Sequence, residues 1–363
     1  MVRRVRPAAP RFVPAARTAL VVAGLAAAVV PRPADLVEQY YGRRLYPALQ
    51  RLVTTASNMV PVALFDVVIV AAAAWCLWWW TAAARAAWTR GTVAPLGAAL
   101  LATGAVGAAG YLWFLGAWGL NYARPPLDVR LGLPAGPPSD ADVASLLALA
   151  VDGANDEYAP AHAADAGAAD NAVARALHAV EARQGRPVPT VPGRPKPTIL
   201  APYFRAAGVD GLTAPLALET LLNPDLLAVE RPFVLAHEWA HLSGYAPEAD
   251  ANFVAWLSVT ASEHPLLRYS GWLFVLSETA RQVGGDARRS ALDRLADGPR
   301  RDLAAIAERA TRWRVDLVER AGWRVYDRYL RAQGVDEGIR SYSRVVEFIV
   351  RARRAGAGAP LRP

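Results

Sequence analysis

The sequence predicts a mainly α-helical protein in which three N-terminal transmembrane helices precede a mostly helical domain with a small β element. Of its 363 residues, 54% are hydrophobic and only 20% are charged, so the chain is more apolar than an ordinary soluble domain. Long uncharged segments lie before residue 120, and apolar residues at helical spacing continue beyond it. We therefore divide the chain into a membrane anchor, 1–120, and a second domain, 121–363.

The first apolar segment, 13–30, follows a basic flank and ends before Pro31. Its uncharged part begins at Thr18 and is short for a membrane span, so a full span includes Arg17, whose long side chain can reach the interface. A signal peptide cleaved near Ala26-Ala27-Ala28 is the alternative. The residues leave this choice open.

Two further apolar segments are clearer. The segment 60–82 contains one charge, Asp66, and runs into tryptophans and arginines of the kind found at bilayer interfaces, while the segment 94–118 has no charge. A loop, 31–59, connects the first two segments. Basic residues gather before the first segment and between the second and third, which places the N-terminus in the cytoplasm. We therefore expect a multi-pass cell-membrane protein whose second domain is extracytoplasmic.

Composition excludes several classes of function. The net charge of +8 comes from arginine, since Lys196 is the only lysine, and no arginine run is interleaved with aromatic residues as nucleic-acid binding requires. The one cysteine, Cys76, lies in an apolar segment and excludes an intramolecular disulfide or a thiolate metal cluster. We expect the lipid bilayer as a partner and no nucleic acid.

The second domain begins with a Pro/Gly-rich linker and divides into a core, 198–283, and C-terminal helices, 287–354. Short β-compatible pieces are expected around 198–200 and 211–215. Helices are predicted over 140–183, 231–243, 247–263, 265–282, 287–330 with a break, and 336–354.

Two of the five histidines fall in the segment His237-Glu238-Trp-Ala-His241. Positions i and i+4 of a helix place both imidazoles on one face, at the separation that two ligands of a tetrahedral zinc ion require. Glu238 then lies beside the open coordination position and can take a proton from zinc-bound water. The alternative is a pair of interfacial histidines on an amphipathic helix.

Glu248 is the expected third ligand because it lies in the first turn of the next predicted helix, which begins near Pro247. Asp250 is the rival ligand, at a less favourable helical phase. Asn252 lies on the same face as Glu248 and is expected to hydrogen-bond a ligand imidazole. An acid favoured by the helix dipole is the alternative explanation of Glu248.

The two motifs together, His-Glu-x-x-His and Glu-x-x-Ala-Asn, resemble those of gluzincin metallopeptidases. More closely, the chain resembles the bacterial membrane family described as domain of unknown function 3810. The similar segments are 40–42, Pro61, 118–124, 211–219, 237–252 and 268–271. The chain departs from that family at Tyr245 and Asp250, where phenylalanine and glutamate are expected. The resemblance implies a membrane-anchored zinc peptidase with a zincin-like domain and supplies no substrate.

Two other segments are candidates for substrate contacts. Tyr269 or Arg268 is expected to stabilise the oxyanion of a tetrahedral intermediate, or else to pack as an ordinary amphipathic side chain. The segment 211–219 is a candidate strand for pairing with an extended peptide.

The sequence therefore predicts a zinc metallopeptidase acting on a peptide or protein, with His237, His241 and Glu248 as ligands and Glu238 as the general base. A non-catalytic zinc-binding membrane scaffold or sensor is the alternative.

Overall fold

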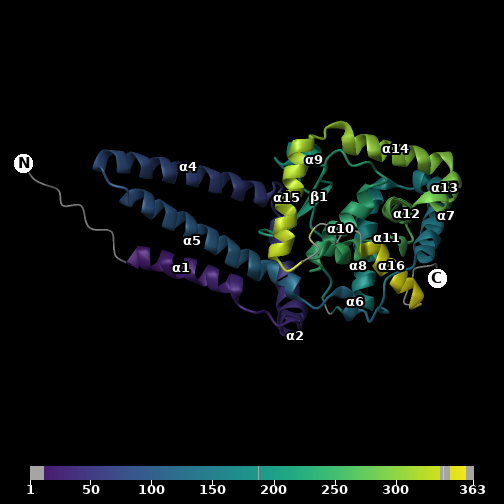
Figure 1. Ribbon diagram of the computed structural model, residues 1–363, viewed down its shortest axis with the longest axis horizontal. Helices are drawn as coiled ribbons and strands as arrows, with labels where there is room; N and C mark the ends of the chain where they lie inside the picture. The colour runs from purple at the N-terminus through teal and green to yellow at the C-terminus, as the bar shows by residue number, and fades with distance from the viewer. Residues whose placement is uncertain (1–11, 187, 336–337, 339–343, 357–363) are drawn as a thin grey trace, which may run out of the picture.

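The computed structural model describes residues 12–186, 188–335, 338 and 344–356, and these form a mainly helical protein with one small sheet (Figure 1). Three apolar helices leave one end of a helical domain and extend away from it: α1 (Phe12–Val29), α4 (Leu64–Arg90) and α5 (Ala94–Ala117). Both α1 and α4 pack against α5. The start of α1 and the turn between α4 and α5 lie at the end farthest from the domain (Figure 1).

Two of these helices, α4 and α5, are long and apolar enough to cross a membrane. Residues 13–29 of α1 pass the same test only together with the helical segment 34–58, from which they are bent by 111°. The number of candidate spans in the described chain is therefore two, or three if this bent pair is one span.

The second apolar helix is shifted relative to the predicted segment 60–82. It begins at Leu64, where Glu219 accepts hydrogen bonds from the amides of Leu64 and Phe65 at 2.9 Å each. It continues to Arg90, because the helix ends only at Gly91, whose φ of 62° suits a residue without a Cβ. The helix therefore extends beyond the apolar segment that predicted it.

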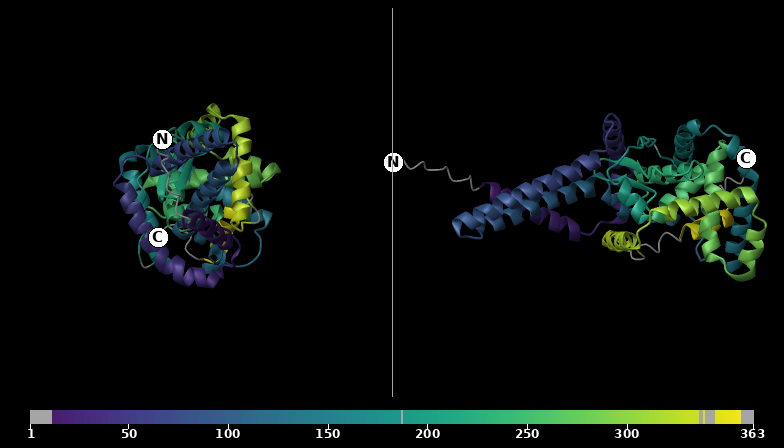
Figure 2. Two further views of the ribbon diagram at one scale, coloured as in Figure 1. Left: turned by 90° about the vertical axis from the view of Figure 1, so that its left-hand side faces the viewer. Right: turned by 90° about the horizontal axis from the view of Figure 1, so that it is seen from above.

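The segment between the first two apolar helices is helical, although the sequence predicted a loop. It comprises α2 (Ala34–Leu36), the π-helical η1 (Val37–Leu45) and α3 (Tyr46–Asn58). Tyr46 and Gln50 are buried on this segment, whereas Leu52 and Met59 are exposed. It runs crosswise to the apolar helices at the end of the domain that they leave (Figure 2).

The first part of the domain contains η2 (Gly119–Ala123), α6 (Leu127–Arg130), α7 (Asp140–Ala163), η3 (Ala166–Ala168), α8 (Ala169–Arg183) and α9 (Ala201–Ala207). The single helix predicted over 140–183 is thus broken. The break follows Asp165, whose side chain accepts a hydrogen bond from the Gly167 amide at 2.8 Å and so competes with the helical backbone pattern.

The sheet of the described chain has two antiparallel strands, β1 (Gly211–Ala214) and β2 (Glu219–Leu222). The expected strand over 211–219 is therefore wrong in extent, because the chain turns between Ala214 and Glu219 with Pro215 in the turn. The β-compatible piece at 198–200 is also wrong, since it leads into α9.

The remaining helices are α10 (Arg231–Leu242), α11 (Glu248–Thr260), α12 (Pro265–Gln282), α13 (Gly285–Asp293), α14 (Asp297–Arg312), α15 (Asp316–Ala332) and α16 (Arg344–Arg354). The stretch predicted as 287–330 with one break has two breaks. Part of the helix predicted over 336–354 lies outside the described residues. The main core gathers α7, α8, α10, α11, α12 and α16, and α15 crosses the end of the domain beside the apolar helices (Figure 1).

Candidate metal centre

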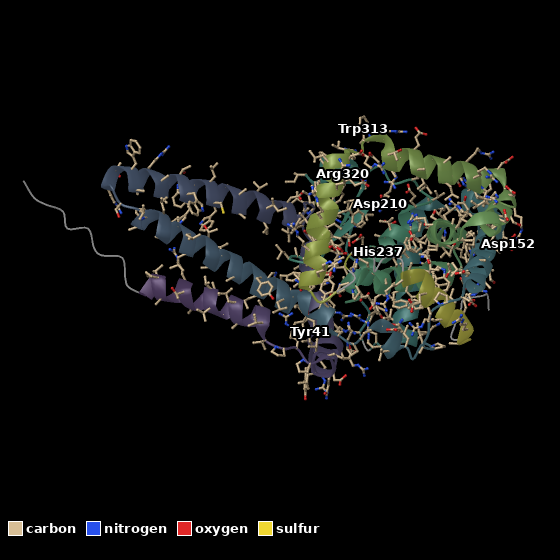
Figure 3. The ribbon with its side chains drawn as sticks, in the orientation of Figure 1. Tyr41, Asp152, Asp210, His237, Trp313 and Arg320 are labelled. Carbon is tan, nitrogen blue, oxygen red and sulfur yellow. The ribbon has the colours of Figure 1, made fainter. Side chains whose placement is uncertain are left out.

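The two motif helices α10 and α11 lie at the centre of the core. The residues 233–236 of α10 are mostly apolar and buried, and Pro232 at the first turn needs no intrahelical donor. Gly244 then reverses the chain with φ 85°, and Pro247 precedes the first residue of α11. Figure 3 shows His237 inside the domain. The sequence folds in this way because α10 and α11 bury apolar faces against each other.

The turn between these helices brings three ligand atoms together. One atom each from His237, His241 and Glu248 lies within 4.8 Å of the other two. The Oε2 atom of Glu248 is 3.2 Å from Nε2 of His237 and 3.6 Å from Nε2 of His241. Asp250, the rival ligand, lies instead 3.8 Å from the guanidinium of Arg130. The geometry therefore groups Glu248 with the histidines and leaves Asp250 apart.

The chemistry of the clustered groups is compatible with a metal ion. Oε2 of Glu248, the oxygen that faces both histidines, is buried and has no hydrogen-bond partner within the described chain. A buried polar atom without a hydrogen bond costs about 1–3 kcal/mol. A metal ion bound to this oxygen and to the two imidazoles would remove that cost. Two imidazole nitrogens and one carboxylate oxygen are the donor set of catalytic zinc sites that keep a fourth position open.

The electrostatics of this cluster favour a cation. Burial alone would lower the pKa of His241, but the adjacent carboxylate of Glu248 raises the pKa to about 9. Burial alone would raise the pKa of Glu248, but the two histidines hold it well below its ordinary value. The carboxylate therefore stays ionised and attracts positive charge, which a proton on His241 or a metal ion can supply.

The imidazole of His241 is oriented by the backbone. Its Nδ1 atom lies 2.8 Å from the carbonyl oxygen of Tyr245, which leaves Nε2 to face the cluster. Asn252 is buried on α11, one turn after Glu248, and its expected hydrogen bond to an imidazole stays a prediction. The role of the Tyr245 carbonyl could not be predicted from sequence, because a backbone acceptor leaves no signal in the residue type.

Glu238 is buried between α10 and β1. Its Oε2 atom accepts a hydrogen bond from Thr213 Oγ1 at 2.8 Å, and burial raises the pKa of its carboxyl group. A Cβ atom at Gly211 would lie 2.4 Å from Oε1 of Glu238. The absence of a side chain at Gly211 therefore makes room for the carboxyl group beside the strand.

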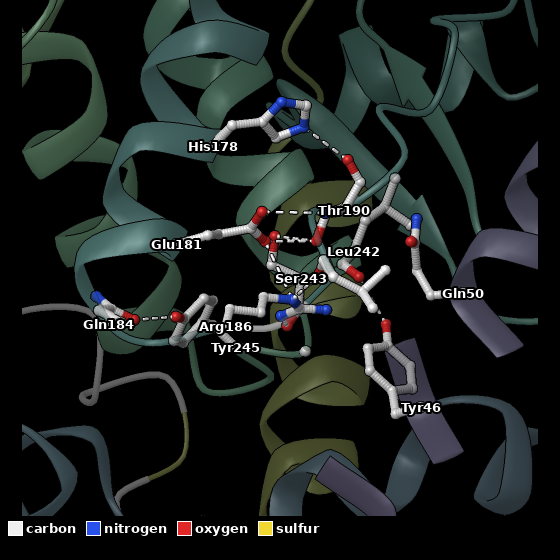
Figure 4. A network of polar contacts seen from close by, with 12 residues as sticks. Tyr46, Gln50, His178, Glu181, Gln184, Arg186, Thr190, Leu242, Ser243 and Tyr245 are labelled. Carbon is white, nitrogen blue, oxygen red and sulfur yellow. Dashed lines mark hydrogen bonds and ion pairs between the residues drawn. The ribbon is translucent and has the colours of Figure 1, made fainter. Parts of the chain in front are cut away.

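The carbonyl groups at the end of α10 are held by side chains from four other segments. The last carbonyls of a helix lack amide partners in a further helical turn, so they need other donors; the His241 carbonyl accepts from the Gly244 amide at 2.9 Å, and side chains supply the rest. The donors are Trp118 Nε1 to His241 at 3.1 Å, Tyr46 Oη to Leu242 at 2.8 Å, the Arg186 guanidinium to Ser243, and Arg124 Nη1 to Gly244 at 3.1 Å. Figure 4 shows the contacts of Tyr46 and Arg186 and the neighbouring network around Glu181. Tyr46, Trp118 and Arg124 belong to segments next to the apolar helices, which thus help to fix the end of the motif helix.

A comparison with known protein families identifies the family of this chain. A family described as "Protein of unknown function (DUF3810)" matches residues 41–350. The chain belongs to this family. The DUF3810 match runs from η1 into α16 and so includes α4, α5 and the three clustered residues. No curated protein and no solved structure matches the chain.

A tyrosine from outside the motif core also reaches the cluster of this DUF3810 protein. The hydroxyl of Tyr326, on α15, donates a hydrogen bond to Oε1 of Glu248, the oxygen that does not face the histidines. The ring of Tyr329, one turn later, packs edge-on against Phe114 of α5 and Tyr122 of η2. Nothing in the sequence pointed to Tyr326, because it lies 78 residues from Glu248 and outside any recognisable motif.

Arg268 and Tyr269 have other partners. The guanidinium of Arg268 forms a two-point ion pair with Glu157 of α7 at 2.8 Å, and the hydroxyl of Tyr269 donates to Asp302 of α14 at 2.6 Å. Both side chains thus join the motif core to neighbouring helices, and their expected role as substrate contacts stays a prediction. Within the described residues, none of the other three histidines joins the cluster.

Proposed function

We propose that this DUF3810 protein is a membrane-anchored zinc metallopeptidase with a zincin-like, gluzincin-type domain. His237, His241 and Glu248 would hold the Zn²⁺ ion, and Glu238 would be the general base. The observation that carries the proposal is the convergence of three ligand atoms within 4.8 Å, with the facing oxygen of Glu248 buried and unpartnered.

The chemistry follows from where the chain places each group. A bound zinc ion would act as a Lewis acid toward a water molecule and a peptide carbonyl. Glu238 would take the proton of the attacking water and pass it to the leaving amine, as a buried carboxyl with a raised pKa is suited to do. Thr213 would hold the Glu238 carboxyl in place through its hydrogen bond.

The substrate we propose is a peptide or protein outside the cytoplasm. β1 lies beside Glu238 and pairs with β2, so an extended chain pairing with its other edge would pass next to the general base. The apolar helices support the membrane part of the proposal. The basic residues before the first apolar segment and between the second and third are the reason to propose a cytoplasmic N-terminus and an extracytoplasmic domain.

A second candidate is a non-catalytic zinc scaffold or sensor with the same three ligands. One observation favours the enzyme. A purely structural site has no need of Glu238, yet space for its carboxyl is made at Gly211 and a hydrogen bond is supplied by Thr213.

Hydrolysis of a library of fluorogenic peptides by the purified full chain tests the proposal. We expect zinc-dependent cleavage that is lost in Glu238→Gln. The exposed acid Glu263 on the loop before α12 gives a matched control, and Glu263→Gln should cleave as wild type does. Bound zinc with no cleavage of any peptide, and with no difference between the two variants, would favour the scaffold.

Sidedness is tested by fusing a reporter that is active only outside the cytoplasm. Activity is expected when the reporter follows residue 363 and absent when it follows residue 88, near the far end of α4. The reverse pattern would place the domain in the cytoplasm.

A further inference from the structure

The outer face of α15 is not covered by the rest of the described chain. Leu317 and Val325 are each 67% exposed, and Trp313, which precedes the helix, is 59% exposed. Several large apolar side chains on one exposed helix mark a surface that binds something apolar.

Three arginines share this face. Arg320, Arg324 and Arg328 are spaced at i, i+4 and i+8, so they form one row along the helix, beside Leu317. None of the three forms an ion pair with any described residue. The face therefore combines apolar side chains with a row of uncompensated positive charge.

The opposite face of α15 is attached to the domain. Gly322 lies against Tyr203 of α9, and the amide of Val315 donates a hydrogen bond to the carbonyl of Ala206 at 2.9 Å. Tyr329 packs on the end of α5, and Leu330 is fully buried. These contacts turn the arginine row away from the protein.

The position of α15 relates this surface to the apolar helices. The helix stands across the end of the domain that α4 and α5 leave, crosswise to both (Figures 1 and 2). Figure 3 shows Trp313 and Arg320 at its upper end. If α4 and α5 cross a bilayer, α15 runs along the bilayer surface, as an interfacial amphipathic helix does.

A second element at the same end has a similar character. Leu36, Tyr40, Leu45 and Leu52 of the segment 34–58 are exposed, together with Arg43. This segment also runs crosswise to the apolar helices (Figure 2). The segment 34–58 and α15 therefore both expose apolar and basic side chains at the end of the domain that the apolar helices leave.

We propose that the outer face of α15 rests on an anionic phospholipid bilayer, with Arg320, Arg324 and Arg328 bound to headgroup phosphates and Leu317 and Val325 inserted between them. The inference rests on the membrane anchoring proposed above and does not depend on zinc. It adds a lipid partner for α15, the helix that also carries Tyr326, whose hydroxyl contacts Glu248 of the candidate metal centre.

Fluorescence quenching by nitroxide-labelled lipids tests this proposal on the full chain in phosphatidylcholine and phosphatidylglycerol nanodiscs. One fluorophore is placed on the native Cys76 of α4. In a Cys76→Ser background, a second is placed at Leu317→Cys and a third at Arg289→Cys, on the exposed α13 at the opposite end of the domain. We expect quenching at Cys76 and at Leu317→Cys, and none at Arg289→Cys.

Each failure has its own meaning. Quenching at Cys76 with none at Leu317→Cys would overturn the inference and leave the anchor standing, and fluorophore self-quenching at Leu317→Cys would then assign the face to a second copy of the chain. Absence of quenching at Cys76 would overturn the anchoring and the inference together. Zinc content, measured on the same samples, reports separately on the metal centre.

The proposed binding to anionic headgroups is tested by removing the positive charges of α15. Replacing Arg320, Arg324 and Arg328 by glutamine should reduce quenching at Leu317→Cys to the level seen in pure phosphatidylcholine. Equal quenching with and without the arginines, and in both lipid mixtures, would show that anionic headgroups are not the partner.

Discussion

The candidate metal centre lies between two helices that are held very differently. Every residue of α11 except Leu257 is buried, whereas Leu330 is the only buried residue among the 17 of α15. Yet both helices contact the same carboxylate, since α11 carries Glu248 and α15 carries Tyr326, which hydrogen-bonds it. On one side of the centre, α11 is part of the buried core; on the other side, α15 packs on the surface of that core.

This difference suggests separate roles for the two sides: α10 and α11 position the clustered residues, and α15 controls access to them. α10 and α11 are fixed by core packing and by the four donors at the end of α10, so the proposed ligands are already ordered before any metal binds. α15 has few buried contacts, and such elements open at low free-energy cost. We infer that α10 and α11, which carry His237, His241 and Glu248, form a rigid floor of the centre. We infer that α15 forms a cover over it that can move.

The largest effect on stability is expected where α4 joins the domain, at Glu219 of β2. Lys196 and Glu219 form an ion pair of 2.5 Å, and both side chains are almost completely buried. Lys196→Met leaves the Glu219 carboxylate without its cation and should destabilise the protein by about 3–5 kcal/mol. Denaturant unfolding in detergent measures this, with exposed Arg194→Met as the control. Equal stability of the two variants would contradict the importance of this junction.

The same junction should make the protein sensitive to acid. Burial alone would raise the pKa of Glu219, but hydrogen bonds from Lys196, Leu64, Phe65 and Ser57 keep the pKa below its ordinary value of 4.5. The stabilisation is therefore complete above that value and is lost as the pH falls through the lower, folded-state pKa. An acid titration of tryptophan fluorescence should show a transition below about pH 4.5 that is absent in Glu219→Gln. An unchanged transition would assign it to other carboxylates.

A smaller effect is expected at the end of α10. Tyr46→Phe removes the donor to the buried Leu242 carbonyl and should cost about 1–3 kcal/mol. Tyr40→Phe is the matched control, since Tyr40 is exposed on the same segment, and it should change stability by less than about 0.5 kcal/mol. Equal effects of the two substitutions would show that the carbonyl cap does not stabilise the floor.

The smallest effect on folding is expected at the cover. Tyr326→Phe removes the hydrogen bond to Glu248 without opening the core, so unfolding should be nearly unchanged. Loss of a hydrogen bond to a ligand carboxylate should weaken zinc binding by about tenfold or more. Competition with a fluorescent zinc chelator measures this, and exposed Arg301→Gln on α14 is the control. Unaltered zinc affinity would mean that the cover does not act on the ligands.

The floor was largely predictable from sequence and the cover was not. His237, His241 and Glu248 lie within twelve residues, so helical spacing and one short turn suffice to bring them together. Tyr326 comes from a distant helix, and its approach depends on how α15 packs against α9 and, through Tyr329, against Phe114 of α5. The helical segment 34–58 was missed for a related reason, since its order comes from distant partners of Tyr46 and Gln50.

Metal analysis of the purified full chain tests the central claim most directly. Elemental mass spectrometry should find one zinc ion per chain in the wild type and in Glu238→Gln, and none in His237→Ala or Glu248→Ala, because only the latter two remove a ligand. Absence of zinc from every variant, or zinc that persists without His237 and Glu248, would contradict the assignment of this centre.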